Sequence, residues 1–460
     1  MKKMLWGGRF GKGPSEKAVL FNSAENIALD ERLIPYDILG SLAHARMLYS
    51  QEIIPTADYE SIATALKRLY GYWKEGRFGL EPRLEDVHMN VESAVTRMTG
   101  AGKKLHTARS RNDQVLLDMR LFMRDRTLDV IEEVESLREA FAGLAKNDGP
   151  MAAYTHTRVA QPITVSFWCQ GWHDSLSRDI ERLQDAYKRI NQSPLGACAV
   201  AGTAWKIDRK ETAALLAFPA VQENAFDTIN SRGECETELL AALSLLMCKL
   251  SRLSEELIWL SQKGLVGIAE EHTTGSSIMP NKKNPDVLEL VRGRTGRVYG
   301  NLNHCLTALK GLMSGYNSDM QETKAAMMGG LDTAEACLDA MAMVVRGLKF
   351  DRKRIEEELD GGFAQATEIA DYLAMHGMPF REAHEMAGRL VKHCEKDGRT
   401  ISAIKAGEAS KLLGMKIGEE NWAALKSLSR PRLKAKFRHE SLDFADRERA
   451  KIEAAFSRLL

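Results

Sequence analysis

Leucine recurs at alternating intervals of four and three residues along one stretch of this chain. Because an α-helix turns once in about 3.6 residues, side chains at this spacing lie along one side of a helix. Such a stripe is typical of a long helix that packs lengthwise against other helices. The series consists of Leu239, Leu243, Leu246, Leu250, Leu253, Leu257 and Leu260.

Four more segments carry apolar stripes with helical spacing, and each predicts a helix about 30 to 45 Å long at the usual rise per residue. Runs that alternate apolar and polar residues between turn signals are sparse, so few strands are expected. The pattern predicts an all-α protein with a central bundle of five long helices, and helices of this length favour side-by-side oligomers. The four segments cover residues 128–144, 165–190, 287–309 and 327–348.

The bundle divides the chain into three expected domains. An N-terminal helical domain is expected at residues 1–111, the bundle at 112–360 and a small C-terminal helical domain at 361–460. The second boundary coincides with the glycine pair Gly361 and Gly362, which interrupts a helical pattern.

Composition and charge limit the partners of such a bundle. The 460 residues are 44% apolar and 28% charged with a formal net charge of +1, so bulk charge favours neither nucleic acid nor a membrane surface. Seven cysteines without a C-x-x-C pair argue against a disulfide framework and a zinc site of the usual spacing. The N-terminus lacks the apolar stretch of a secretory signal, and no window approaches the roughly 18 apolar residues of a membrane span. A cytoplasmic protein is expected.

Residues 275–286 form a glycine-led polar segment between two helical patterns. Gly275 can take backbone angles that are closed to other residues, so the segment can swing and bring its N–H groups near a ligand. Two adjacent lysines, an amide and two hydroxyl groups make it cationic and rich in hydrogen-bond donors. The segment predicts a loop that closes over an anion, and the alternative is a solvated connection between helices.

Three other polar clusters fall at breaks between the long helices, at residues 106–114, 154–158 and 316–324. The first combines arginines and amides near a helix N-terminus, which suits a carboxylate or phosphate, although capping by Ser110 or Asn112 would also explain it. The second contains a histidine beside hydroxyl groups, a residue that can act as acid or base near neutral pH. Gln161 and Pro162, just after this cluster, are expected to start the next helix. The clusters predict shared pockets at the ends of the bundle.

The combination of residues favours elimination next to a carboxylate. No GxGxxG, P-loop, metal-ligand spacing or GxSxG elbow occurs, so hydride transfer, NTP hydrolysis and triad hydrolysis lack their usual parts. In an elimination a base removes the proton beside the carboxylate, and charge spreads into that carboxylate. Lys282, Asn284 and loop N–H groups could stabilise this charge, at about 3 to 4 kcal/mol for each well-placed donor.

With these residues in view, the sequence resembles the argininosuccinate lyases of the fumarase/aspartase superfamily. The likeness runs from residues 5–10 through the four polar clusters to 366–373 and 379–384. The superfamily shares the Gly-Ser-Ser-x-Met-Pro core, whereas the 282–286 ending of the loop is specific to this lyase. The resemblance implies reversible cleavage of argininosuccinate to arginine and fumarate, the last step of arginine biosynthesis, without cofactor or metal.

The resemblance also implies a homotetramer whose bundles form a 20-helix core, with each active site built by three subunits. Ser276 would be the catalytic serine of the mobile loop and His156 its partner in proton transfer, oriented by Glu289. Which of the two is base and which is acid stays open. Lys282 and Asn284 would hold the carboxylates on the fumarate side. The other implied substrate contacts are Asn26, Arg111, Asn112, Thr155, Tyr316, Gln321 and Lys324.

Some stretches depart from the family pattern. The serine expected just before residue 27 falls on Asn26, with Ser23 three residues earlier, so either residue could contact substrate. The segment 230–234 lacks the two acidic residues that usually surround the arginine, and only Arg232 matches cleanly. Residues 429–432 and 438–440 also match poorly. No function is assigned to the last three stretches.

Two alternative functions stay open. One is a different superfamily lyase that acts on adenylosuccinate, aspartate or malate, and Lys283, Asn284 and the 316–324 cluster argue against it. The other is a non-catalytic structural protein similar to an eye-lens crystallin. The presence of Ser276 and His156 argues against that second alternative.

Overall fold

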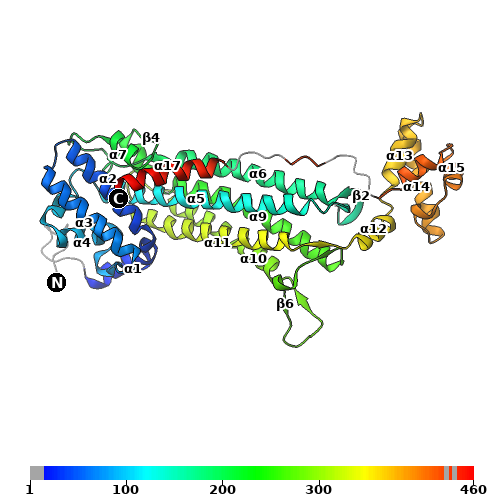
Figure 1. The fold of residues 1–460 in the computed structure, drawn as a ribbon, viewed down its shortest axis with the longest axis horizontal. Helices are drawn as coiled ribbons and strands as arrows, with labels where there is room; N and C mark the ends of the chain where they lie inside the picture. The colour runs from blue at the N-terminus through cyan, green and yellow to red at the C-terminus, as the bar shows by residue number, and fades with distance from the viewer. Residues whose placement is uncertain (1–14, 429–434, 438–442) are drawn as a thin grey trace.

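The computed structural model describes residues 15–428, 435–437 and 443–460. The family likeness at residues 5–10 and the departures at 429–432 and 438–440 lie outside these described residues. The described chain forms a long rod of helices with a group of shorter helices at each end (Figure 1). None of the described helices combines the length and apolar character that crossing a bilayer requires.

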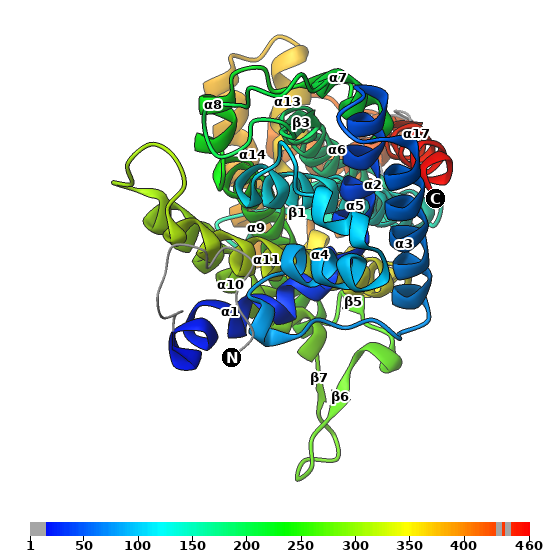
Figure 2. The same cartoon turned by 90° about the vertical axis from the view of Figure 1, so that its left-hand side faces the viewer.

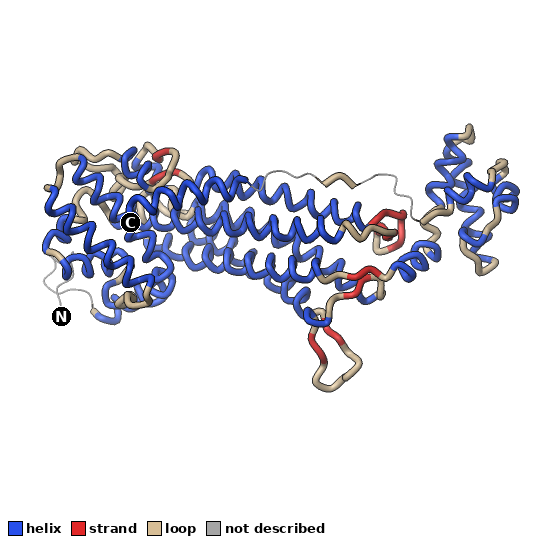
Figure 3. Tube along the Cα trace, viewed as in Figure 1, coloured by secondary structure: helices blue, strands red, loops and turns tan. Residues whose placement is uncertain are grey.

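Five long helices form the rod, as the apolar stripes predict. α9 packs against α10, α5 packs against both α6 and α11, and α10 packs against α11. The tube in Figure 3 is helical along nearly all of the rod, which confirms the all-α fold class. The bounds are α5 (Arg111–Leu144), α6 (Val165–Ile190), α9 (Glu234–Gln262), α10 (Asp286–Leu309) and α11 (Glu322–Arg346).

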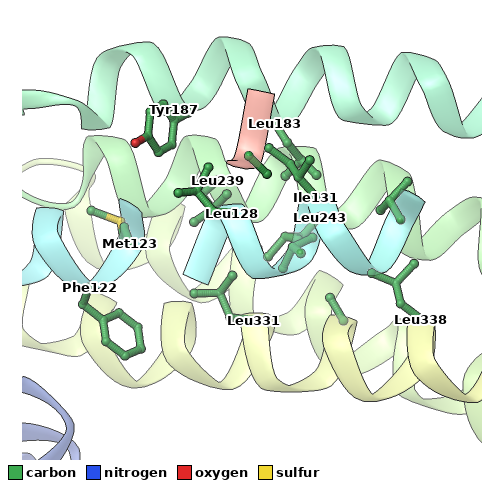
Figure 4. Close-up of a cluster of buried hydrophobic side chains, with 14 of the residues drawn as sticks. Phe122, Met123, Leu128, Ile131, Leu183, Tyr187, Leu239, Leu243, Leu331 and Leu338 are labelled. Carbon is green, nitrogen blue, oxygen red and sulfur yellow. The ribbon is translucent and has the colours of Figure 1, made fainter. Parts of the chain in front are cut away.

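The leucine stripe of α9 lies in the core of the bundle. All seven leucines are between 0% and 2% exposed, and burying each such side chain contributes about 2 kcal/mol. Figure 4 shows Leu239 and Leu243 in one buried cluster with Leu128 and Ile131 of α5 and Leu331 of α11. Packing of the stripes against each other therefore holds the rod together.

Shorter helices cover one end of the rod, and Figure 2 shows them facing the viewer. Most of their buried apolar side chains belong to the same core as the bundle, whereas Ile229 lies in a small separate cluster with Leu116 and Ala197. The α-helices there are α1 (Glu16–Asp30), α2 (Ile34–Ser50), α3 (Thr56–Lys74), α4 (Val87–Met98), α7 (Arg209–Leu215) and α8 (Ala225–Asn230). The 3₁₀ helices are η2 (Glu31–Leu33), η3 (Pro82–Leu84) and η4 (Gly100–Lys104).

The opposite end carries the short helices of the C-terminal region (Figure 1). Residues between Ile369 and Trp422 form a core of their own. The last helix, α17 (Asp443–Leu459), instead returns along the rod, packs on α5, α2 and α7, and belongs to the main core. The short helices are α12 (Arg352–Gly361), α13 (Ala366–Met375), α14 (Phe380–Lys396), η7 (Ile401–Ala403), α15 (Ala406–Leu413) and α16 (Glu419–Leu425).

Strands are short and paired in twos. The longest pair corrects one expectation, because α6 was predicted to begin at Gln161, whereas residues 158–164 form a strand and α6 begins at Val165 behind the capping hydroxyl of Thr164. The antiparallel pairs are β1 (Pro150–Thr155) with β2 (Arg158–Thr164), β5 (Val266–Gly267) with β8 (Lys349–Phe350), and β6 (Thr274–Gly275) with β7 (Lys283–Asn284). The parallel pair is β3 (Gln192–Ser193) with β4 (Ala220–Val221).

Candidate active site

His156 lies at the tip of the β1–β2 hairpin. Thr155 pairs with Arg158, so His156 and Thr157 form a two-residue turn. Their φ angles are 51° and 59°, and two left-handed residues in succession are typical of the turn that joins tightly twisted strands. Left-handed backbone is unfavourable for residues other than glycine, and such strain often marks a functional position. The turn holds the exposed His156 side chain out into solvent.

Ser276 and Lys282 lie on the β6–β7 hairpin, which projects from the side of the rod (Figures 1 and 2). The Oγ of Ser276 accepts hydrogen bonds from the backbone N–H of Met279 at 3.1 Å and of Ile278 at 3.4 Å. Lys282 is exposed. Gly275 has no left-handed φ, and a Cβ there would meet nothing. The predicted closure of this segment stays a prediction.

The β6–β7 hairpin leads directly into α10. Asn284 is the last residue of β7 and is half-buried. Glu289 lies exposed in the first turn of α10, where a carboxylate is stabilised by the helix dipole. Three predicted site residues, Ser276, Lys282 and Asn284, therefore share one hairpin, and Glu289 follows within a turn of helix.

A second group of predicted residues lies at the N-terminal end of the rod and is joined by hydrogen bonds. The Asn26 side-chain amide of α1 donates to Oε1 of Gln321 at 2.6 Å. The Gln321 amide donates to the Tyr316 hydroxyl at 2.7 Å. Gln321 ends the short helix η6 (Ser318–Gln321). The three side chains thus form a polar chain between two segments far apart in sequence.

Lys324 belongs to the same end of the molecule and is buried. Its ammonium forms an ion pair with Asp30, and the two residues are 5% and 2% exposed. Asp30 also accepts a hydrogen bond from the Val87 N–H at 3.0 Å. An ion pair this deeply buried is costly to break by removing one partner.

Arg111 and Asn112 begin α5. Ser110 and Asp113 form the capping box, so of the two expected capping residues Ser110 is the cap. The Arg111 guanidinium donates to Glu85 at 2.9 Å and lies 3.4 Å from Asp86. The Asn112 amide donates to the Ala199 carbonyl at 3.2 Å. Both predicted contacts therefore carry protein partners that a substrate carboxylate would have to replace.

A buried acidic cluster was not found from the sequence. Nδ1 of His88 lies 2.8 Å from Asp37 and 3.4 Å from Asp118, and these side chains are the described group whose atoms lie close enough to hold a metal ion. Burial alone would raise the pKa of Asp37, but His88, Arg109 and Gln114 lower it below its usual value. Burial and Asp37 raise the pKa of Asp118 well above its ordinary value.

This cluster joins α2, α4 and α5 in the interior. The positive charge of the buried Arg109 opposes a cation there and balances the carboxylates. The sequence alone could not predict this cluster, because its members are far apart along the chain. Asp37 is 51 residues from His88 and 77 residues from Gln114.

Within one chain the predicted residues do not converge on one place. The β1–β2 hairpin lies at the end of the rod opposite α1, and the β6–β7 hairpin projects from its side (Figure 1). The structure brings Asn26, Tyr316 and Gln321 together and keeps His156 and Ser276 away from them.

Comparisons with known proteins decide the family. Residues 16–300 match the sequence family described as Lyase, and residues 363–429 match Argininosuccinate lyase C-terminal. The chain is 47% identical over 412 residues to an argininosuccinate lyase of Syntrophus aciditrophicus, covering 88% of this chain and 87% of that protein. It belongs to the argininosuccinate lyase family. The expected carbon–nitrogen lyase is thereby confirmed.

Other relatives agree with this membership. An argininosuccinate lyase of Citrifermentans bemidjiense is 46% identical, covering 88% of this chain and 89% of that protein. Among solved structures, an EDDS lyase in complex with formate has a TM-score of 0.77 at 27% identity, covering 98% of this chain and 90% of that one. A class II fumarase from Schistosoma mansoni has a TM-score of 0.73 at 17% identity over 86% and 90% of the two chains, and shows the shared fold.

Within the argininosuccinate lyase family, the departure at Asn26 now has a structural setting. Ser23 is 1% exposed, and its single hydroxyl proton is shared between the carbonyls of Val19 at 2.9 Å and Pro82 at 3.1 Å. Asn26 faces Gln321 instead. Of the two candidates, Asn26 lies in the polar chain and Ser23 is used inside the fold.

Proposed function

We propose that this chain catalyses the reversible β-elimination of argininosuccinate to L-arginine and fumarate, the last step of arginine biosynthesis, in the cytoplasm. The similarity to argininosuccinate lyases over 88% of the chain carries this proposal. The competing substrates are adenylosuccinate, aspartate and malate. Purified protein should release fumarate from argininosuccinate, measured by its ultraviolet absorbance, and activity on adenylosuccinate alone would refute the proposal.

The chemistry begins with removal of the proton on the carbon beside a substrate carboxylate. Ser276 is the proposed base, and the two N–H groups that bond its Oγ support this role, because hydrogen bonds to an oxygen favour its charged form. Charge moves into the neighbouring carboxylate, where Lys282 and Asn284 stabilise it. The C–N bond then breaks as the C=C bond of fumarate forms.

His156 is the proposed donor of the proton that the departing guanidino nitrogen takes up. Its place at an exposed turn leaves the side chain accessible to a substrate. Glu289 is the proposed partner that orients the imidazole, with Thr155 as a substrate contact beside it. The reverse assignment, with His156 as base and Ser276 as acid, uses the same contacts and is the alternative.

The arginine half of the substrate is assigned to the other end of the rod. Tyr316, Gln321, Asn26 and Lys324 are the proposed contacts there, and Arg111 and Asn112 are assigned to substrate carboxylates. The partners that these groups already have support a preformed polar surface. A substrate has to touch both groups of residues, and one chain holds them apart.

A homotetramer with active sites shared by three subunits follows from this separation. The end of the rod that carries Asn26, Tyr316, Gln321 and Lys324 is here called the polar end. Antiparallel packing of the rods would place the hairpins of one chain beside the polar end of another. Large apolar side chains exposed along α9, α10 and α11 support such packing, because a solvated helix rarely presents so many. They are Leu245, Leu290, Tyr299, Leu306 and Met343, between 38% and 55% exposed. The division into domains at residues 111 and 360 is part of this proposal.

Mixing two inactive variants tests the shared site. Ser276→Ala removes a group of the hairpin, and Arg111→Ala removes one of the polar end. Refolding the two together should restore measurable lyase activity, since some sites then receive both intact parts. Each variant refolded alone is the control. If one chain built a whole site, the mixture would stay inactive.

A non-catalytic role like that of a lens crystallin is the second candidate. The presence of every proposed catalytic group argues against it. An intact oligomer without activity on any of the four substrates would favour it.

A further inference from the structure

The segment between α8 and α9 contacts the loop that carries Tyr316. The Oδ1 of Asn230 accepts a hydrogen bond from the Gly315 N–H at 2.6 Å. The guanidinium of Arg232 lies over the Tyr316 ring, 4.8 Å from its centroid. Ser231 faces the other way, and its Oγ accepts from Arg120 of α5 at 3.0 Å. The segment is thus anchored to the bundle on one side and touches the site loop on the other.

The charge of Arg232 is buried. Arg232 is 8% exposed, and Glu236, in the first turn of α9, is 2% exposed. Burial lowers the pKa of Arg232, and Tyr316 and Glu236 oppose that change. A cation in this position attracts the face of an aromatic ring more strongly than one in water. Arg232 is therefore placed to hold the Tyr316 ring.

The backbone at Gly233 explains why no acidic residue stands directly after Arg232. Gly233 has a φ of 88°, and a Cβ on it would lie 2.6 Å from the Leu309 side chain at the end of α10. Only glycine fits that turn without displacing Leu309. The Gly233 N–H donates to Glu236 at 3.0 Å, so the acidic partner comes from the helix instead.

We propose that Asn230 and Arg232 are positioning residues that set the affinity of the site for the arginine half of the substrate. They act through Tyr316, whose hydroxyl accepts from Gln321, which in turn accepts from Asn26. The proposal rests on the proposed function, because it assigns this polar chain to arginine. It gives a role to the segment that departs most from the family pattern.

The test compares two buried arginines that each lie on an aromatic ring. Arg232→Lys is the test variant and Arg124→Lys is the control, since Arg124 is 1% exposed, lies 4.3 Å from the centroid of Phe218 and contacts no residue of the polar chain. The inhibition constants of arginine and of fumarate as products are measured for both variants and the wild type. A loss of packing alone would change the two variants alike.

Arg232→Lys should raise the inhibition constant of arginine about tenfold, the range expected for losing a buried cation–π contact, and leave that of fumarate unchanged. Arg124→Lys should change neither. An equal change for both products, or none, would overturn the proposal. If Arg232→Lys fails to fold, Asn230→Ala provides the same comparison through the Gly315 contact. A wild-type protein without argininosuccinate activity would instead refute the proposed function.

Discussion

The two groups of candidate site residues differ in how the chain holds them. At the N-terminal end Asn26, Gln321 and Tyr316 are joined by hydrogen bonds, and Lys324 is buried in an ion pair. On the two hairpins, by contrast, Ser276 is bonded only to its own turn, and Lys282 and His156 are exposed. One chain therefore bonds the first group across segments far apart in sequence, whereas it bonds Ser276 only within its own hairpin.

The difference has a physical consequence. Side chains with few buried contacts contribute little to the stability of the fold, whereas buried and bonded groups contribute to stability as well as to any binding they perform. Variants on the hairpins should therefore lower activity without lowering the stability of the fold. Variants at the polar end should lower both. The following changes are ordered from the largest expected effect to the smallest.

Ser276→Ala and His156→Asn should each lower kcat by about 1,000-fold, the size expected when a proton-transfer group is lost. The thermal unfolding midpoint should stay at the wild-type value, because neither side chain contacts the core. Ser277→Ala, at the neighbouring hydroxyl, is the matched control and should keep most of the activity. Wild-type activity in both variants would remove these residues from the mechanism.

Lys324→Met should lower the lyase activity and the free energy of unfolding together. It leaves the Asp30 carboxylate buried without its cation, which costs about 3 to 5 kcal/mol of unfolding free energy. Denaturant unfolding measures this loss, and the fumarate assay measures the activity. Lys283→Met is the comparison on the exposed hairpin, where the ion pair with Glu270 is in solvent, and should leave stability unchanged. If both lysine variants were equally stable, the contrast between the two groups would fail.

Acid should destabilise the fold because His44, a histidine of α2, is buried in the described structure. Burial and, to a smaller extent, the charge of Arg109 lower the pKa of His44 from 6.5 to about 3. Between those values the unfolded chain binds a proton that the folded chain does not. The free energy of unfolding therefore falls as the pH is lowered below 6.5, by about 2 kcal/mol from this residue between pH 6.5 and 4.5.

His44→Gln isolates that contribution. Glutamine can still donate to the Thr107 carbonyl, which His44 contacts at 2.9 Å, and it does not titrate. Denaturant unfolding at several pH values should show a smaller loss of stability in acid for this variant. A wild-type slope in His44→Gln would show that the buried imidazole is not kept neutral.

The predictable parts of the molecule are those with a local pattern. The spacing of Leu239, Leu243 and the leucines that follow them predicts a buried helix without any other information. The same holds for the other four apolar stripes. The β1–β2 hairpin was not predicted because burial does not alternate along its strands and its turn, His156 and Thr157, contains no glycine. Gln161 and Pro162 predicted a helix start there instead. The hydrogen bonds of the polar chain could not be predicted for another reason. Asn26 and Gln321 are 295 residues apart in sequence, and only the packing of α1 on the bundle brings them together.

The smallest effects come from the two residues that could fill the variable family position. Asn26→Ala removes the bond to Gln321, and a single hydrogen bond is worth about 0.5 to 1.5 kcal/mol, so the inhibition constant of arginine should rise about two- to tenfold. Ser23→Ala removes the hydroxyl proton shared by the Val19 and Pro82 carbonyls and should lower the free energy of unfolding by a similar amount without changing that constant. The opposite result would assign the contact to Ser23 and would mean that α1 shifts when substrate binds, so that even the polar end is completed by its ligand.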